Sequence, residues 1–327
     1  MNELLYKVVI AGLVGFIFNI VLCPVIIPYL HKMKFGQTVR DDGPKEHLKK
    51  TGTPTMGGIM IIISFFFSAI LFSTQNREGL LVIFVTVAFG VIGFLDDYIK
   101  VIKKRSLGLR AYQKFLLQMI VTGLLAYYLM QDQSYREIYI PFTNGLTFDL
   151  GMIYPVFVFI VVLGTVNGTN FTDGLDGLAT GVTSLVTVFF LFCCLSMDKQ
   201  MSPVVSGALG SLLGFLLFNA HPAKIMMGDT GSLALGGFIS SVALFLKMPL
   251  FIVIVGVIYL AEVLSVALQV LYFKATKGKR LFKMAPIHHH FELLGWEEPK
   301  VVATFYVVTA IACLVGFLAS RGILMNI

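Results

Sequence analysis

Charged residues are scarce in this sequence. Asp, Glu, Lys and Arg make up 13% of its 327 residues, and 57% of the residues are hydrophobic, whereas a soluble globular domain contains about 25% charged residues. This composition excludes an ordinary soluble domain and indicates an all-α polytopic membrane protein. Because short loops join apolar runs along nearly the whole chain, we expect residues 1–327 to form a single transmembrane domain, although length alone allows about two.

Cysteine patterns and internal repeats are also lacking. Cys23, Cys193, Cys194 and Cys313 all fall in apolar runs and form no CxxC or metal-like spacing, so we expect them to be packing residues. No repeat with a period of about 20 to 50 residues and no inverted half-repeat is present, which gives no support to a transporter built from two related halves.

Ten apolar runs have roughly the length of a membrane helix, about 17 to 25 residues. We expect these helices at residues 4–30, 57–74, 79–98, 113–130, 152–169, 176–196, 203–218, 231–246, 249–273 and 301–320. The first run is longer than a signal-peptide core and lacks a small-residue cleavage site, so we expect an uncleaved first helix. An even number of helices places both termini on one side of the membrane.

The distribution of Lys and Arg predicts the orientation. Four connecting segments, residues 31–56, 99–114, 219–230 and 274–300, contain 19 of the 25 Lys and Arg residues. By the positive-inside rule these segments are cytoplasmic and both termini are extracytoplasmic. This topology and anionic lipid headgroups account for the net charge of +7, so we expect membrane lipids and no nucleic acid as partners.

One connection predicts β-structure. Residues 137–149 place Asn144-Gly145 between two short runs of β-favouring residues, which is typical of a β-hairpin. The hairpin joins the fourth and fifth predicted helices, so we expect it on the extracytoplasmic face.

Carboxylates gather at the cytoplasmic ends of the predicted helices. Asp96 and Asp97 end the third helix, Asp173 and Asp176 follow the fifth, and Asp229 precedes the eighth. Carboxylates beside hydrocarbon segments are a functional-site hypothesis by default, and Mg²⁺ usually takes one or two protein carboxylates together with phosphate oxygens. We therefore expect an active site on the cytoplasmic side. Solvated charges that mark helix ends are the simpler interpretation of each pair taken alone.

Two further segments suit phosphate groups. Residues 227–232 form a polar turn at the start of the eighth helix, where free N–H groups attract anions, and Asp229 is there either a metal ligand or a helix cap. Residues 49–58 place Gly and Thr residues behind Lys49 and Lys50. This loop either contacts a diphosphate or simply flanks the start of the second helix.

The remaining unusual polar residues lie near the C-terminus. His288, His289 and His290 are consecutive, so they cannot all face one metal ion from a helix or a strand. We expect imidazoles that line a pocket for anionic oxygens. Glu262 lies inside the ninth predicted helix, where it is a proton-relay residue, a hydrogen-bonded structural residue or a residue near a bend.

Five motifs follow one another along the chain: GTPTMGG at 52–58, DDYIK at 96–100, NFTDGLDGLATG at 170–181, NAHPAKIMMGDTGSLALGG at 219–237 and MAPIHHHFELLGW at 284–296. In this order they resemble the phospho-N-acetylmuramoyl-pentapeptide transferase family, part of the polyprenyl-phosphate N-acetylhexosamine-1-phosphate transferase superfamily. The triple histidine with its flanks resembles this family rather than its sister transferases, which act on UDP-N-acetylglucosamine and similar sugars.

The resemblance implies a reaction and a location. It implies Mg²⁺-dependent transfer of phospho-N-acetylmuramoyl-pentapeptide from UDP-N-acetylmuramoyl-pentapeptide to undecaprenyl phosphate, which releases UMP and forms the first lipid-linked peptidoglycan precursor, lipid I. It also implies a homodimer in the bacterial cytoplasmic membrane. We expect single-step attack by the lipid phosphate, because an aspartyl intermediate would add a second step. The alternatives are a sister transferase that uses UDP-N-acetylglucosamine and an ion-coupled membrane transporter.

The resemblance also implies residue roles. Asp229 resembles the Mg²⁺ ligand, with Asp96 and Asp97 as further candidates, Asp96 resembles the acid that deprotonates the lipid phosphate, and Lys100 closes the Asp-Asp motif. Positions that contact the nucleotide, the phosphates or the sugar are Lys50, Thr55, Lys114, Asn170, Asp173, Asp176, Gln269, His288, His289 and His290. Met226 departs from the family pattern, because many members carry an aromatic residue there, so the resemblance does not imply stacking of uracil on this side chain.

Overall fold

The computed structural model describes residues 2–32, 52–73, 76–103, 108–197 and 199–324. These residues include ten long helices: α1 (Asn2–Lys32), α2 (Gly58–Ser73), α3 (Arg77–Ile102), α4 (Ala111–Met130), α5 (Tyr154–Thr172), α6 (Leu178–Ser196), α7 (Ser202–Asn219), α8 (Gly228–Phe245), α10 (Val257–Ala275) and α12 (Glu298–Ala319). The shorter elements are η2 (Gln133–Arg136), β1 (Glu137–Tyr139), β2 (Thr147–Asp149), η3 (Gly151–Ile153), η4 (Pro249–Phe251), α9 (Ile252–Val255), α11 (Ile287–Glu292) and α13 (Arg321–Leu324).

A helix lies in each of the ten predicted ranges, and the all-α fold class is confirmed. The ninth range, 249–273, is divided into η4, α9 and α10, because the helix is interrupted at Gly256, which has a φ of −96° and a ψ of 26°. Glycine is among the weakest helix formers, so a break there is physically reasonable. In the part of the chain that the structure describes, seven helices are long and apolar enough to cross a membrane: α1, α3, α5, α6, α7, α10 and α12. Helix α2 is a shorter apolar helix.

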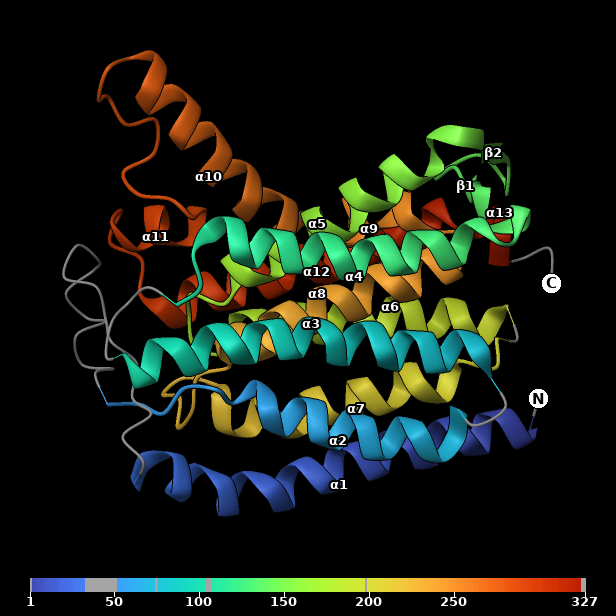
Figure 1. Ribbon diagram of the computed structural model, residues 1–327, viewed down its shortest axis with the longest axis horizontal. Coiled ribbons are helices and arrows are strands. Elements are labelled where there is room, and N and C mark those ends of the chain that lie inside the picture. Colours follow the sequence, from blue (N-terminus) through green and yellow to red (C-terminus); the bar gives the residue numbers. More distant parts are fainter. Residues whose placement is uncertain (1, 33–51, 74–75, 104–107, 198, 325–327) are drawn as a thin grey trace.

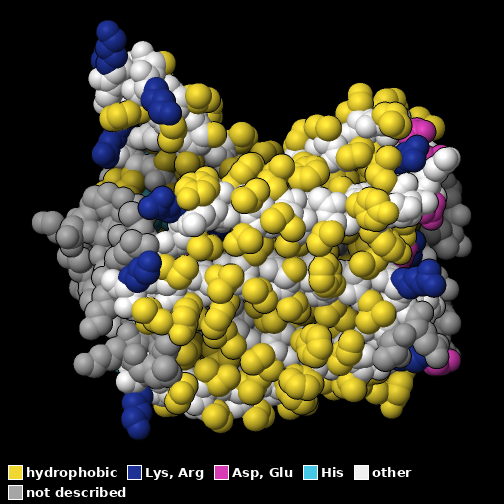
Figure 2. Space-filling view, in the orientation of Figure 1, with side chains coloured by type: hydrophobic (Ala, Val, Ile, Leu, Met, Phe, Trp, Pro, Cys, Tyr) yellow, Lys and Arg dark blue, Asp and Glu magenta, His cyan; other side chains and the backbone are white. Residues whose placement is uncertain are grey.

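The long helices run side by side, so their ends form two opposite faces of the molecule (Figure 1). At one face, which we call the hairpin end, α1 and α3 begin and β1, β2 and α13 lie. At the opposite face, which we call the aspartate end, α3 and α5 finish and α8 begins. Hydrophobic side chains cover the middle of the surface in Figure 2, while Lys and Arg lie towards the two ends. This band is what a bilayer core requires, and the chain is a membrane protein.

The hairpin prediction is confirmed. β1 and β2 pair antiparallel, with Glu137 opposite Asp149. Asn144 and Gly145 adopt positive φ values of 52° and 87°, as the central residues of a type I′ turn require, and Leu146 N donates to Thr143 O across them at 3.3 Å. This turn lies within the longer connection from Tyr139 to Thr147. The two strands form the one sheet found among the described residues.

The centre of the bundle is α8. Residues 230–245 are all buried, and α8 contacts α2, α3, α5 and α6. Its small residues allow the neighbouring backbones to come close: a Cβ on Gly236 would lie 2.4 Å from the Cα of Val166 in α5. Close packing through small residues is the usual way in which membrane helices associate. It fixes the first turn of α8, including Asp229, between α3 and α5.

Candidate active site

The first turn of α8 is capped by a carboxylate from α3. Oδ2 of Asp97 accepts hydrogen bonds from Thr230 N at 2.9 Å and from Thr230 Oγ1 at 2.7 Å. Its Oδ1 accepts a bond from Asp229 N at 3.2 Å. The first N–H groups of a helix have no partner within the helix and carry partial positive charge, so Asp97 satisfies them and joins the end of α3 to the start of α8.

Two glycines make this junction possible. A Cβ on Gly93, one turn before Asp97, would lie 2.0 Å from the backbone oxygen of Asp229. A Cβ on Gly228 would lie 2.7 Å from Oδ2 of Asp97, and the φ of Gly228 is 74°. A side chain at either position would separate the two helices, and the positive φ additionally favours glycine at 228.

Two lysines bridge the carboxylates of this region. Nζ of Lys100 lies 2.6 Å from Oδ2 of Asp96 and 3.5 Å from Oδ1 of Asp97. The same Nζ lies 2.9 Å from Oδ2 of Asp229, and Nζ of Lys114 approaches that oxygen to 2.8 Å. With three carboxylates and two ammonium groups in their ordinary charge states, the cluster keeps one net negative charge.

Asn170 holds the Asp229 carboxylate from a third side. Its Nδ2 donates to Oδ1 of Asp229 at 2.9 Å and to Oγ of Ser232 at 2.8 Å. Its Oδ1 accepts a bond from Nζ of Lys114 at 3.3 Å. The carboxylate of Asp229 is therefore oriented by residues of α3, α4 and α5, yet 16% of its side chain remains exposed, so a ligand can reach it.

The three carboxylates fit a divalent cation. One oxygen from each of Asp96, Asp97 and Asp229 lies within 4.8 Å of the others, and carboxylate oxygens are the ligands that Mg²⁺ prefers. Both oxygens of Asp97 already accept bonds from α8, and Oδ1 of Asp96 accepts one from Leu109 N at 2.9 Å. The partners of Asp229 and of Oδ2 of Asp96 are side chains, Lys100, Lys114 and Asn170, which can turn aside for an ion as backbone groups cannot. Asp229 and Oδ2 of Asp96 are therefore the better donors, and these residues could hold a metal ion.

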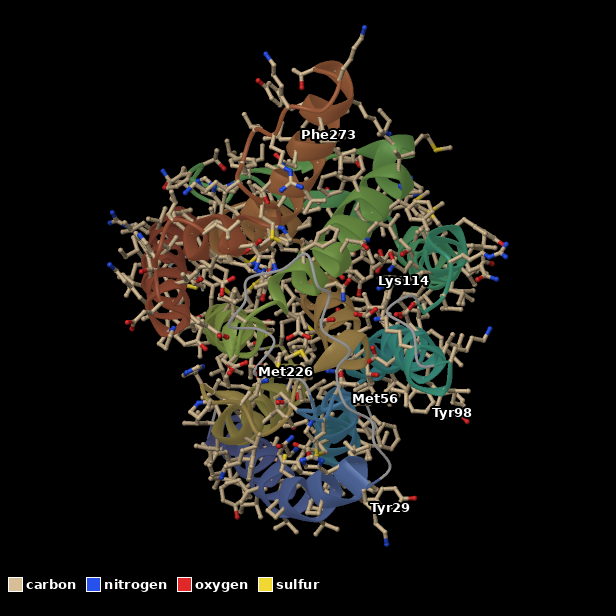
Figure 3. All side chains as sticks on the ribbon, turned by 90° about the vertical axis from the view of Figure 1, so that its left-hand side faces the viewer. Tyr29, Met56, Tyr98, Lys114, Met226 and Phe273 are labelled. Atoms are coloured by element: carbon tan, nitrogen blue, oxygen red, sulfur yellow. The ribbon has the colours of Figure 1, made fainter. Side chains whose placement is uncertain are left out.

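The loop before α2 reaches the same place. Met226 N donates to Pro54 O at 2.8 Å, and Gly57 N donates to Met226 O at 2.9 Å. This pairing brings Thr55 to the start of α8, where its Oγ1 would lie 3.0 Å from a Cβ on Gly228. Met56, Lys114 and Met226 all lie near the middle of the aspartate end in Figure 3, while Tyr29 and Phe273 lie towards its margins.

Asp173 joins the turn after α5 to the start of α8. Its Oδ2 accepts a hydrogen bond from Gly228 N at 3.0 Å. Removal from bulk water, and then the charges of Asp229 and Asp97, hold the pKa of Asp173 well above its usual range. The side chain therefore lies beside the carboxylate cluster and contacts it through the α8 backbone.

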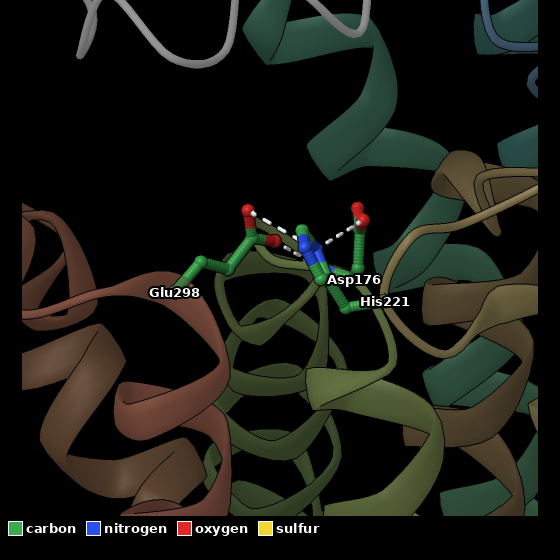
Figure 4. A group of neighbouring side chains, drawn as sticks. All are labelled: Asp176, His221 and Glu298. Atoms are coloured by element: carbon green, nitrogen blue, oxygen red, sulfur yellow. Dashed lines mark hydrogen bonds and ion pairs between the residues drawn. The ribbon is translucent and has the colours of Figure 1, made fainter.

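Asp176 belongs to a second group, shown in Figure 4. Its Oδ2 lies 3.1 Å from Nδ1 of His221 and accepts a bond from Ala223 N at 3.0 Å. Glu298, at the start of α12, accepts a bond from Asp176 N at 2.7 Å, and its Oε2 lies 3.9 Å from Nδ1 of His221. One oxygen or nitrogen from each of the three side chains lies within 4.8 Å of the others. The group ties the turn after α5 to the α7–α8 loop and to α12.

The C-terminal histidines have partners of their own. His288 is buried and its Nδ1 lies 3.0 Å from Oε1 of Glu262. Nδ1 of His289 lies 2.7 Å from Oε2 of Glu292. Nδ1 of His290 accepts a bond from Lys283 N at 3.1 Å. Of the interpretations of Glu262, a hydrogen-bonded role agrees with its contact to His288.

Gln269 holds the loop that leads to α11. Its Oε1 accepts bonds from Leu281 N at 3.0 Å and Phe282 N at 2.9 Å, and its Nε2 donates to Phe282 O at 3.1 Å. The polar atoms of the Gln269 side chain are thus hydrogen-bonded to the backbone of this loop.

The structure brings most of the sequence-predicted residues together, in three groups at the aspartate end. The first group contains Asp96, Asp97, Lys100, Lys114, Asn170, Asp173, Asp229 and Thr55; the second contains Asp176; the third contains Gln269, His288, His289 and His290. Lys50 lies outside the described residues.

Sequence reasoning missed four partners: Thr230, Ser232, His221 and Glu298. The first two lie inside the 227–232 turn, whose polar character was visible. Nothing in the sequence indicated that residues 176 and 298 would meet, because 122 positions separate them.

Comparison with known proteins identifies the family. The model of glycosyl transferase family 4 matches residues 79–247. A phospho-N-acetylmuramoyl-pentapeptide-transferase of Clostridium kluyveri is 50% identical over 96% of this chain and 100% of its own length. Proteins of the same name from Clostridium botulinum and Acetivibrio thermocellus are 52% and 51% identical, over 97% and 94% of this chain and 98% and 94% of their own lengths. The chain therefore belongs to the phospho-N-acetylmuramoyl-pentapeptide transferase family of membrane enzymes.

Proposed function

We propose that this enzyme transfers phospho-N-acetylmuramoyl-pentapeptide from UDP-N-acetylmuramoyl-pentapeptide to undecaprenyl phosphate, releasing UMP and forming lipid I. The observation that carries the proposal is the cluster of Asp96, Asp97, Asp229, Lys100 and Lys114 at the ends of membrane helices. A lipid phosphate requires a site at the membrane edge, and a nucleotide requires one that faces water. Carboxylates and lysines at helix ends meet both requirements within one transferase domain, residues 1–327.

The proposed orientation places the aspartate end in the cytoplasm. The bias of Lys and Arg supports it, and UDP-linked sugars are cytoplasmic compounds. Both termini and the hairpin are then extracytoplasmic, in the bacterial cytoplasmic membrane. A cysteine introduced at Asn144, in the hairpin turn, should react with a membrane-impermeant maleimide added to intact cells. Protection of this cysteine until the cells are opened would reverse the orientation.

The reaction consists of one displacement at phosphorus. An oxygen of the lipid phosphate attacks the sugar-linked phosphorus of the donor, the bond to the uridine-linked phosphate breaks, and UMP leaves. Asp96 accepts the proton of the lipid phosphate through Oδ2, the oxygen that faces Lys100 at 2.6 Å. Lys100 and Lys114 offset the anionic charge that gathers on the phosphate oxygens.

Mg²⁺ fits the same cluster, with Asp229 as its principal ligand. Oδ2 of Asp96 cannot bind the ion and accept the proton at the same time, so we assign Asp96 the role of base. When bound, Mg²⁺ would supply positive charge that polarises the diphosphate. Asp97 has a different role, because its oxygens are used by the α8 backbone. It positions Asp229 by holding the first turn of α8.

The remaining predicted residues surround this cluster and are proposed to bind the donor. Thr55 and Asn170 lie closest to it, and with Lys50 they are proposed to contact phosphate groups. Asp173 and Asp176 are proposed to face the nucleotide. Gln269 and the three histidines, His288, His289 and His290, are proposed to lie on the sugar and peptide side. We further propose that the enzyme is a homodimer, which native mass spectrometry in detergent would test.

A competition between donors tests the substrate class. Purified enzyme with Mg²⁺ and undecaprenyl phosphate is offered UDP-N-acetylmuramoyl-pentapeptide and UDP-N-acetylglucosamine together. We expect a lipid-linked product that contains only the muramoyl-pentapeptide. A product that contains only N-acetylglucosamine would assign the chain to a sister activity.

A trapping experiment tests the single displacement. The enzyme is incubated with a donor labelled in its sugar-linked phosphate, without any lipid acceptor, and is then analysed by peptide mass spectrometry. We expect no label on the protein. A phospho-sugar attached to Asp96 or Asp97 would replace the single displacement by a two-step reaction.

A further inference from the structure

The turn between α5 and α6 carries two of the proposed donor contacts, Asp173 and Asp176, and between them lies Gly174. A Cβ on Gly174 would lie 2.2 Å from Nε2 of His288 and 2.5 Å from its Cε1. The imidazole therefore packs directly against the backbone of this turn. Only glycine leaves room for the ring, so the position of the turn and the position of the ring determine each other.

The ring of His288 is itself held by a carboxylate inside the membrane bundle. Its Nδ1 lies 3.0 Å from Oε1 of Glu262 in α10, and the two side chains are 1% and 0% exposed. Oε2 of Glu262 and Nε2 of His288 are buried without a hydrogen-bond partner among the described residues. Buried polar atoms without partners reduce stability, so this pair is poorly explained as a device for stability alone. The pair is better explained if function requires the imidazole of His288 to lie at this position.

We propose that Glu262 and His288 form a buried positioning dyad that sets the α5–α6 turn for donor binding. The proposal rests on the proposed function and refines it for His288, which acts on donor binding through the turn rather than by touching the donor itself. Glu262 accepts the Nδ1–H of His288, which fixes the orientation of the ring, as carboxylates do for functional histidines elsewhere. The ring then fixes Gly174, and through it the two aspartates of the turn.

The dyad acts on donor binding more than on the transfer step. The carboxylate of Asp229 is held separately by Lys100, Lys114 and Asn170. Loss of the dyad therefore leaves the charged cluster assembled while the turn moves. The expected result is a raised KM for the donor, with kcat and the KM for the lipid acceptor retained.

Three variants test the dyad. Glu262→Leu removes the acceptor and should raise the donor KM about tenfold, the effect of losing one hydrogen bond to a charged group. Glu262→Gln keeps an acceptor oxygen of the same reach and should recover most of the donor affinity. Gly174→Ala displaces the ring from the other side and should raise the donor KM as well. Glu137→Gln, at an exposed position of strand β1 at the hairpin end, is the matched control and should change nothing.

A double variant tests whether Glu262 and Gly174 affect donor affinity through the same ring, that of His288. If Glu262 acts through the ring, the double variant Glu262→Leu with Gly174→Ala should bind the donor no more weakly than the worse single variant. Additive losses would show that the two residues act independently and would overturn the dyad.

Donor affinity is measured by isothermal titration with UDP-N-acetylmuramoyl-pentapeptide in the absence of lipid acceptor, beside steady-state kinetics. A wild-type enzyme that binds no donor would overturn the proposed function itself. Normal wild-type binding that is unchanged in Glu262→Leu would overturn only the dyad. An equal change in kcat and in both KM values would also overturn it, because that pattern indicates a general structural defect.

Discussion

Replacing Asp229 by Asn should nearly abolish the reaction while leaving the fold intact. The carboxylate of Asp229 contacts Lys100 at 2.9 Å, Lys114 at 2.8 Å and Asn170 at 2.9 Å. An amide of the same shape keeps one oxygen that can accept bonds from the lysines. Asn170 Nδ2 loses its acceptor on the other side, but the shape of the site is retained. The change removes one negative charge from the cluster, which then has no net charge and a weaker attraction for a divalent cation.

The size of the effect follows from Coulomb's law. A unit charge about 4 Å from another contributes about 4 kcal/mol at an effective dielectric constant of about 20, which corresponds to about 10³-fold in a binding constant. Mg²⁺ carries two unit charges, so this value is a lower limit. We therefore expect the Mg²⁺ concentration needed for half-maximal UMP release to rise at least about 10³-fold, so that turnover at millimolar Mg²⁺ is lost.

The assay is a Mg²⁺ titration of UMP release by purified Asp229→Asn, with size-exclusion profile and donor binding as checks of folding. Asp132→Asn is the control, because Asp132 is exposed and caps only Ser134 N at the hairpin end. Near-normal turnover of Asp229→Asn with an unchanged Mg²⁺ midpoint would refute the metal assignment.

Three further predictions concern the same junction. Gly93→Ala should lower kcat about 10²-fold, because the added Cβ would contact the α8 backbone and displace Asp229. Gly164→Ala is the control and should keep full activity, because a Cβ there meets nothing within 4 Å. Equal activity of the two variants would contradict the packing argument. Asp97→Ala should lower the melting temperature in detergent, because the N–H groups of Asp229 and Thr230 lose their acceptor. Each unsatisfied group should reduce the free energy of unfolding by about 1–3 kcal/mol. An unchanged melting temperature would show that the cap is dispensable. Treatment with EDTA should stop UMP release and added Mg²⁺ should restore it, and activity that persists after dialysis against EDTA would exclude a metal requirement.

The sequence was sufficient for the helices and for the main cluster. Apolar runs of the right length predicted all ten long helices, because hydrocarbon imposes both length and polarity on a membrane span. Asn144-Gly145 predicted the hairpin, because few dipeptides accept two positive φ values. Asp96 and Asp229 could be expected to meet, because topology places the end of α3 and the start of α8 at one face.

The remaining features depend on packing between distant segments. The group of Asp176, His221 and Glu298 requires the start of α12 to lie against the turn after α5, which local patterns do not encode. The pair of Glu262 and His288 likewise depends on how α10 packs against α11. A lone Glu in an apolar run indicates that a partner exists, but only the fold identifies which residue it is.

The most direct test of the account is the complete reaction in a defined system. Purified enzyme in detergent is mixed with Mg²⁺, undecaprenyl phosphate and UDP-N-acetylmuramoyl-pentapeptide, and both products are quantified by mass spectrometry. The account predicts equal amounts of UMP and lipid I, with neither product formed when the lipid phosphate is omitted. UMP release that does not depend on the lipid phosphate, or the absence of a lipid-linked muramoyl-pentapeptide, would contradict it.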